Sequence, residues 1–270
     1  MILLHLTDLH MRPRGLAAMR ACETNMLAER ALRAVRDFRP RADALIISGD
    51  LTNNGRVEEY RCFAEVLGRL IDIPVYVIPG NHDHRVNMRA ELAHLPGVTT
   101  DPEFIQYTVE DLPVRLVLLD TLIQGKTDGE LCPKRLAWLD ATLAAAPDTP
   151  TVVVMHHPSF VCGIGHMDRI ILREPATFNA LIARHKQVQL ILTGHHHRQI
   201  TTRIAQATAI IAPGVAHIVE LDLFSDHPGL WNLEPACFLA HCWIEGQGVV
   251  SHTGFVERYP GPFPFMPDPA

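Results

Sequence analysis

Short apolar runs, each ended by a polar loop, are the main feature of the hydrophobic pattern. Five of them have the length of buried strands: 2–6, 44–48, 75–78, 151–155 and 188–192. The segments between them place apolar residues three or four positions apart, which predicts helices at 23–38, 57–70, 85–95, 133–146 and 174–185. This alternation of strands and helices predicts an α/β fold built on a largely parallel sheet.

The pattern changes after residue 197. Four strand-like runs follow without a helix between them: 199–205, 208–211, 237–244 and 249–256. They predict a C-terminal antiparallel extension that seals the sheet or forms a second layer. We therefore expect one domain over residues 1–256. Residues 257–270 form a proline-rich tail that cannot join a sheet interior, and we expect it to act as an arm in a homo-oligomer.

Composition excludes several classes of protein. The net charge of −6 and the lack of a Lys/Arg run argue against long nucleic acid as a partner. No apolar stretch is long enough to span a bilayer, so no membrane partner is expected. The six cysteines form no Cys-x-x-Cys pair and the first residues do not resemble a signal peptide, so we expect reduced thiols and a cytoplasmic protein.

The polar residues that follow the strands carry the chemistry. Seven of them are potential metal ligands: Asp8, His10, Asp50, Asn81, His156, His195 and His197. Because ligands bind outside the carboxyl ends of parallel strands, we expect these loops to converge. Seven oxygen and nitrogen donors are too many for one tetrahedral zinc ion and suit two divalent ions, Mn, Fe or Zn, that share a bridging carboxylate. Such a centre promotes phosphoryl displacement by a metal-bound hydroxide.

In sequence order these residues form the blocks Asp-x-His, Gly-Asp, Gly-Asn-His-Asp, His and Gly-His-x-His. The series resembles the signature of the calcineurin-like metallophosphoesterases. The resemblance implies a β-sandwich flanked by helices in four layers, α/β/β/α. It also implies two metal sites that share Asp50 as the bridge. One would take Asp8, His10, Asp50 and His197, and the other would take Asp50, Asn81, His156 and His195.

The same resemblance assigns the reaction to a few residues. Asp50 and His82 are the expected catalytic residues, because His82 has no ligand position and would lie beside the substrate phosphate. There it would stabilise charge or protonate the leaving alkoxide. Asn81, His82 and His197 are the expected substrate contacts.

Within the family, the chain resembles the bacterial glycerophosphodiesterases and class III cyclic nucleotide phosphodiesterases in its length, its His156-His157-Pro158 run and its C-terminal portion. Purple acid phosphatases place a Tyr ligand where this chain has Asn53, and protein Ser/Thr phosphatases have Asp-Arg-Gly after the bridging Asp. We therefore expect a phosphodiesterase for cyclic nucleotides or glycerophosphodiesters. The alternatives are a phosphomonoesterase, a nuclease and a catalytically silent binding module.

Supporting residues are less well defined by the sequence. His157 is expected to hold a neighbouring ligand by a hydrogen bond, or to be an ordinary buried histidine. Asp83 and Asp120 either orient ligand histidines or cap turns. Four loop residues are candidates for substrate contact by position alone: Arg14, Asn53, Cys162 and His166. His196 has no expected role, and His217 is expected to be structural.

Overall fold

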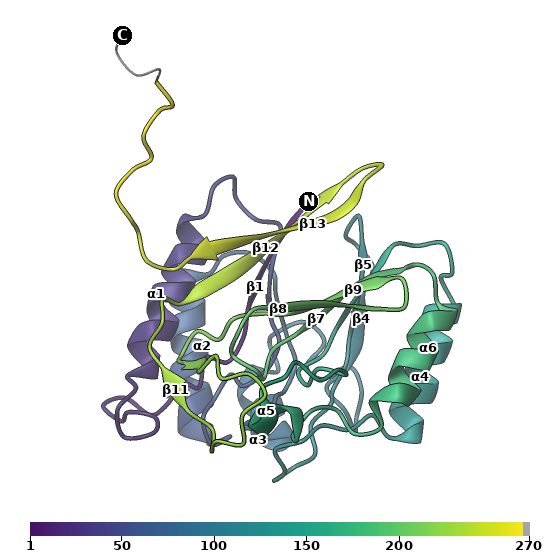
Figure 1. Ribbon diagram of the computed structural model, residues 1–270, viewed down its shortest axis with the longest axis horizontal. Helices are drawn as coiled ribbons and strands as arrows, with labels where there is room; N and C mark the ends of the chain where they lie inside the picture. Colours follow the sequence, from purple (N-terminus) through teal and green to yellow (C-terminus); the bar gives the residue numbers. More distant parts are fainter. Residues whose placement is uncertain (267–270) are drawn as a thin grey trace.

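The computed structural model describes residues 1–266, which form two large β-sheets with helices outside them (Figure 1). The first sheet has the order β13-β12-β1-β2-β3. Its strands are β1 (Ile2–Leu6), β2 (Ala44–Ile47), β3 (Val75–Val77), β12 (Cys237–Ile244) and β13 (Gly248–Phe255). β1, β2 and β3 are parallel, whereas β12 and β13 add an antiparallel hairpin beside β1. The expected C-terminal antiparallel extension is present here.

The second sheet has the order β4-β5-β6-β7-β9-β8. Its strands are β4 (Tyr107–Val109), β5 (Arg115–Leu118), β6 (Thr151–Val154), β7 (Val188–Thr193), β8 (Ile200–Ile204) and β9 (Ala207–Ile211). β9 pairs in parallel with β7, which corrects the expectation that every strand after residue 197 is antiparallel. A small separate pair joins β10 (Ile218–Val219) to β11 (Trp231–Asn232).

Side chains along the strands of the second sheet alternate between two hydrophobic cores, one on each face of the sheet. Leu116 and Leu118 of β5 belong to the main core, which also contains the apolar faces of α1 (Thr24–Asp37), α2 (Val57–Leu70) and the first sheet. Val117, between them, belongs to a second core with α4 (Pro133–Ala144) and α6 (Pro175–Arg184). Successive residues thus face the sandwich interior and the outer helices in turn. The predicted four-layer α/β/β/α fold is confirmed.

The helices begin and end close to the predicted positions. Pro133 and Pro175 occupy the first turns of α4 and α6, where proline leaves no unsatisfied N–H. α3 (Arg85–Leu92) follows the loop after β3, and a short unpredicted helix, α5 (Gly165–Asp168), lies in the loop before α6. None of the helices within residues 1–266 has the length and apolarity needed to cross a bilayer.

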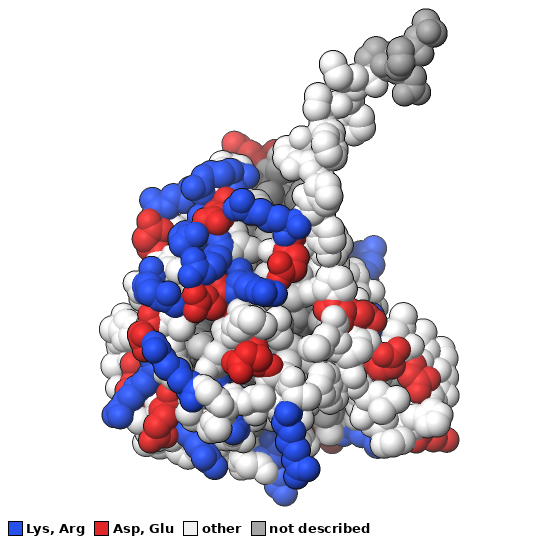
Figure 2. Space-filling view, turned by 90° about the vertical axis from the view of Figure 1, so that its left-hand side faces the viewer, with Lys and Arg blue, Asp and Glu red and all other residues white. Residues whose placement is uncertain are grey.

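Beyond β13, residues 257–266 form no helix or strand and are exposed. The remainder of the proline-rich tail, residues 267–270, lies outside the described residues. Figure 2 shows basic and acidic side chains interleaved on the face that carries α1, where Arg33 pairs with Glu29 and Arg30 pairs with Glu257. The described residues of this face form no continuous basic stripe that would suit nucleic acid.

Candidate metal centre

The loops that follow five strands meet at one edge of the sandwich. They follow β1, β2 and β3 of the first sheet and β6 and β7 of the second. Within the first sheet, the backbone N–H of His10 donates to Asp50 O over 2.9 Å. The backbone N–H of His195 donates to Asp8 Oδ2 over 3.0 Å and thereby joins the two sheets. The structure brings all seven expected residues to this edge.

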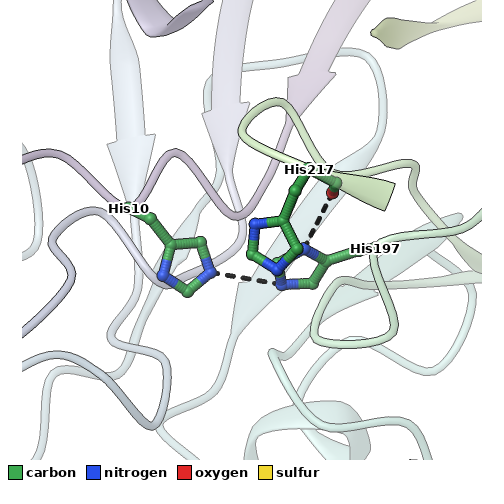
Figure 3. A group of neighbouring side chains, drawn as sticks. All are labelled: His10, His197 and His217. Carbon is green, nitrogen blue, oxygen red and sulfur yellow. Dashed lines mark hydrogen bonds between the residues drawn. The ribbon is translucent and has the colours of Figure 1, made fainter. Parts of the chain in front are cut away.

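Four of the seven form one compact group. One ligand atom from each of Asp8, His10, Asp50 and His197 lies within 4.8 Å of the others, and all four residues are buried. His197 Nε2 is 3.1 Å from Asp8 Oδ1 and 3.2 Å from His10 Nε2. Figure 3 draws the contact between the two rings. Tetrahedral sites with ligand bonds of about 2.0–2.2 Å place their donors at about this spacing.

Asp50 links this group to a second one. Its Oδ2 atom is 3.7 Å from His10 Nε2 and 3.4 Å from His156 Nε2. His156 Nε2 is also 3.1 Å from Asn81 Oδ1, and the ring nitrogens of His156 and His195 approach within 4.8 Å. The other oxygen of Asp50, Oδ1, accepts a hydrogen bond from the backbone N–H of His82 over 2.8 Å. Oδ2 is therefore positioned between the two groups.

Backbone carbonyls orient three of the four candidate histidine ligands. His156 Nδ1 bonds to Ser48 O (2.8 Å), His197 Nδ1 to His217 O (2.9 Å) and His195 Nε2 to Ile170 O (3.0 Å). A carbonyl can only accept, so each of these nitrogens carries a proton, and the opposite nitrogen is the one that can bind a metal once it is deprotonated. This is the usual arrangement for histidines that bind a metal.

Backbone conformation is unusual at the same residues. Asp8, His10, Asp50, His195 and His197 all have positive φ values, between 48° and 69°. The left-handed region is uncommon for residues other than glycine and costs on the order of 1–3 kcal/mol. Five such residues at one sheet edge indicate that local backbone strain is tolerated here because it orients these side chains toward one another.

Two glycines allow the loops to approach this closely. A Cβ atom at Gly80 would lie 2.3 Å from Asp50 Oδ1, and one at Gly194 would lie 1.9 Å from Thr7 Oγ1. Only a residue without a side chain fits at either position. The glycines of the sequence blocks therefore provide space beside the carboxylates.

Electrostatics favour a cation at the centre. Burial alone would raise the pKa of Asp50, but His156 and His82 outweigh burial and hold it well below its usual range. Burial would lower the pKa of His156, but Asp50 outweighs burial and raises it to about 9. The pKa of His10 falls to about 3, because of burial first and then of His82. The carboxylates are thus ionised, which suits divalent ions.

His157 differs from the expectation of a hydrogen bond to a neighbouring ligand. Its ring nitrogens lie within 4.8 Å of those of His156 and His195. However, its Nδ1 bonds to Thr121 Oγ1 (2.8 Å) and its Nε2 to Thr127 O (3.2 Å), so both nitrogens are already used. The ring packs edge-on against His156, with centroids 4.9 Å apart, and supports the site by contact.

Asp83 caps turns and does not contact a ligand histidine. Its carboxylate accepts from the backbone N–H groups of Leu51, Thr52 and Gly80 and from the hydroxyl of Tyr60. It therefore joins the loop that carries Asp50 to the loop that carries Asn81. Asp120 forms a two-pronged ion pair with Arg85, at 2.7 and 2.8 Å, and does not orient a ligand histidine either.

The candidates for substrate contact do not all lie at the site. The exposed side chain of His82 lies beside the first group, with its ring 4.7 Å from that of His10, and its Nδ1 bonds to Asn53 O over 2.8 Å. Arg14 instead pairs with Glu65 of α2, so its guanidinium is already engaged by a carboxylate. Cys162 and His166 lie on the loop whose Ile170 carbonyl bonds to His195.

His217 is a residue of this site that the sequence reasoning missed. Its ring lies 4.1 Å from that of His197 and 5.3 Å from that of His10, with centroids as reference points (Figure 3). The available signal was its place after the run 208–211, which is broken by Pro213-Gly214 just before His217. An antiparallel strand would end at the opposite edge of the sheet. Because β9 is parallel to β7, its carboxyl end lies at the same edge as that of β7.

Comparisons with known proteins identify a family and several relatives. A family model described as calcineurin-like phosphoesterase matches residues 1–199. A probable glycerophosphodiester phosphodiesterase, GpdQ, from Arcobacter nitrofigilis is 34% identical over 266 residues, which cover 98% of this chain and 97% of that protein. A probable cyclic nucleotide phosphodiesterase from Rhodopseudomonas palustris is 33% identical over 251 residues, with coverages of 92% and 89%.

A solved structure supports the fold. The dimetal phosphatase from Danio rerio superposes with a TM-score of 0.68 at 15% identity, covering 95% of this chain and 99% of that one. Its low identity limits that comparison to architecture. The family match and the similar relatives over nearly the whole length show that this chain belongs to the calcineurin-like phosphoesterase family.

Proposed function

We propose that this chain hydrolyses small phosphodiesters at a dinuclear metal centre. The position of Asp50 Oδ2 carries the proposal, because this atom faces His10 Nε2 on one side and His156 Nε2 on the other, at 3.7 and 3.4 Å. One ion would be held by Asp8, His10, Asp50 and His197. The other would be held by Asp50, Asn81, His156 and His195.

The donor set indicates which ions fit. Imidazole, carboxylate and amide donors without sulfur accept Mn, Fe or Zn. When bound, two divalent ions supply the Lewis acidity that activates water and stabilises the phosphoryl oxygens. The chain itself contributes fixed donors, because backbone carbonyls hold three of the four imidazoles and the His82 N–H holds Asp50.

His82 is the residue that we propose for proton transfer. Asn53 O engages its Nδ1, so the ring is oriented and its Nε2 is left for the substrate. Its side chain is exposed beside the buried group, where a leaving alkoxide can reach it. We propose that His82 protonates that oxygen or stabilises the charge that develops on it. Asn81 and His197 would also contact the phosphate.

Charge favours a diester over a monoester. A monoester carries more negative charge than a diester and needs additional cations to bind it. Arg85 and Arg198 follow His82 and His197 closely in the sequence, but they are paired with Asp120 and Glu234. The similar proteins are named for glycerophosphodiesters and cyclic nucleotides, and we propose these two classes as substrates.

The test is hydrolysis by metal-free protein that has been reconstituted with manganese. Bis(p-nitrophenyl) phosphate should be turned over faster than p-nitrophenyl phosphate, and 3′,5′-cyclic AMP should be compared with a glycerophosphodiester in the same preparation. Faster turnover of the monoester would favour the phosphomonoesterase alternative. No turnover despite two bound ions would favour the silent binding module.

A further inference from the structure

A second group of metal-type side chains lies outside the proposed dinuclear centre. Cys162, Asp168 and His196 each offer one ligand atom within 4.8 Å of the others. Cys162 and Asp168 come from the loop between β6 and α6, and His196 comes from the turn after β7. The three donors are a thiol, a carboxylate and an imidazole, whereas the proposed dinuclear ligands include no sulfur.

His196 is the observation that points to a ligand. Its side chain is fully buried, and neither of its ring nitrogens has a hydrogen-bond partner among residues 1–266. Leaving a buried polar group without a partner costs on the order of 1–3 kcal/mol. The histidines on either side of it bond to backbone carbonyls, whereas both ring nitrogens of His196 are available to a ligand.

The two other donors are already fixed in place. Asp168 Oδ1 accepts from the backbone N–H of Cys162 over 2.7 Å, and Oδ2 accepts from that of Gly163 over 2.9 Å. Each oxygen keeps a further lone pair. Burial raises the pKa of Cys162 to about 11, and the Asp168 carboxylate adds to this increase. At neutral pH Cys162 is therefore a thiol, and an ion that binds its sulfur would displace the proton and neutralise the thiolate beside the Asp168 carboxylate.

We propose that Cys162, Asp168 and His196 form a third metal site, for a zinc-like divalent ion with water as the fourth ligand. Thiolate, carboxylate and imidazole are all zinc ligands. The two negative charges of Cys162 and Asp168 balance the charge of the ion, and His196 gains the partner that it lacks. Ligand binding requires only small side-chain movements, because the donors are already neighbours.

The site would fix the position of a loop. Ile170, two residues after Asp168, accepts the hydrogen bond from His195 Nε2. The hydrogen bond from His195 to Ile170 already joins the loop before α6 to the turn after β7. An ion bound by Cys162, Asp168 and His196 would join the same loop and turn a second time. The third ion would thus position the loop that orients His195, without contacting the substrate itself.

Cobalt(II) is the probe, because a thiolate ligand gives it a near-ultraviolet charge-transfer band that nitrogen and oxygen ligands do not give. We expect full-length metal-free protein to develop this band when loaded with Co²⁺. The Cys162→Ser variant should lose the band and one bound cobalt per chain. The matched control, Cys132→Ser, replaces a half-buried cysteine that lies beside Arg135 and should keep both.

An Asp50→Ala variant separates this proposal from the proposed function, because it should lose the dinuclear ions and still show the band. Absence of the band in the cobalt-loaded wild-type protein would overturn the third site. Persistence of the band at full intensity in Cys162→Ser would overturn it as well. Neither result depends on whether His196 can be replaced without unfolding the protein.

Discussion

At the scale of single residues, three of the four candidate ligand histidines have one ring nitrogen bonded to a backbone carbonyl, which leaves the other nitrogen for a metal. His156 and His197 use Nδ1 for a carbonyl, whereas His195 uses Nε2. The sequence predicted which residue types meet, because strand ends share an edge. It could not predict which nitrogen is free, because the carbonyl partners of His195 and His197 lie about 20 or more residues away in the chain.

Replacing His82 by Ala should lower kcat for bis(p-nitrophenyl) phosphate by about 10²-fold or more and leave the metal content unchanged. The reason is that Asp50 is held by the backbone N–H of His82, which alanine retains. Turnover and metal content should be measured on the same sample. His94→Ala, at an exposed position, is the control, and loss of metal from the His82 variant would instead make His82 a ligand.

The affinity for metal should rise with pH up to about 9. The pKa of His156 is raised to about 9, so at neutral pH the metal-free protein carries a proton that an ion must displace. Each displaced proton makes the affinity rise about tenfold per pH unit below that pKa, and the rise stops above it. Calorimetric titration with Mn²⁺ at several pH values measures the effect. An affinity that stops rising near pH 6.5 would contradict it.

At the scale of elements, strand direction decides which loops reach the site. β9 is parallel to β7, so the loop after β9 carries His217 to the same edge as His197. The hydrophobic pattern predicted the strand but not its direction, because no helix separates it from the strand before it. Direction here depends on pairing between β7 and β9, with β8 placed at the sheet edge.

Asp83→Ala should lower the free energy of unfolding by about 3–5 kcal/mol, because it leaves buried donors of two loops without an acceptor. These donors include the N–H groups of Leu51 and Gly80 and the hydroxyl of Tyr60. Urea unfolding measures the change. The exposed control, Asp72→Ala, should cost less than about 1 kcal/mol. Equal losses in the two variants would show that Asp83 does not join the loops.

At the scale of the whole molecule, most of the fold could be predicted and part of the site could not. The apolar runs predicted the strands, and the family resemblance implied the two-sheet sandwich that the structure has. The Cys162, Asp168 and His196 group could not be predicted, because Cys162 and His196 are 34 positions apart in the sequence and only the fold of their loops brings them together.

Removing residues 259–270 should change the oligomeric state, if the proline-rich tail is an arm that docks on a second copy. Within the described part of this tail, Phe263 and Phe265 are exposed, and burying such rings on a neighbour would stabilise an oligomer. Light scattering gives the mass of both proteins in solution. An unchanged mass after the deletion would remove the tail from the oligomer interface.

The central claim is that Asp50 bridges two metal ions that together support diester hydrolysis. The most direct test measures bound manganese and turnover of bis(p-nitrophenyl) phosphate for the wild-type protein, Asp50→Ala and the surface control Asp72→Ala. We predict that the wild type and the control bind two manganese ions per chain and hydrolyse the substrate. We predict that Asp50→Ala binds no manganese and shows no turnover. An Asp50→Ala protein that keeps both ions would contradict the bridging role.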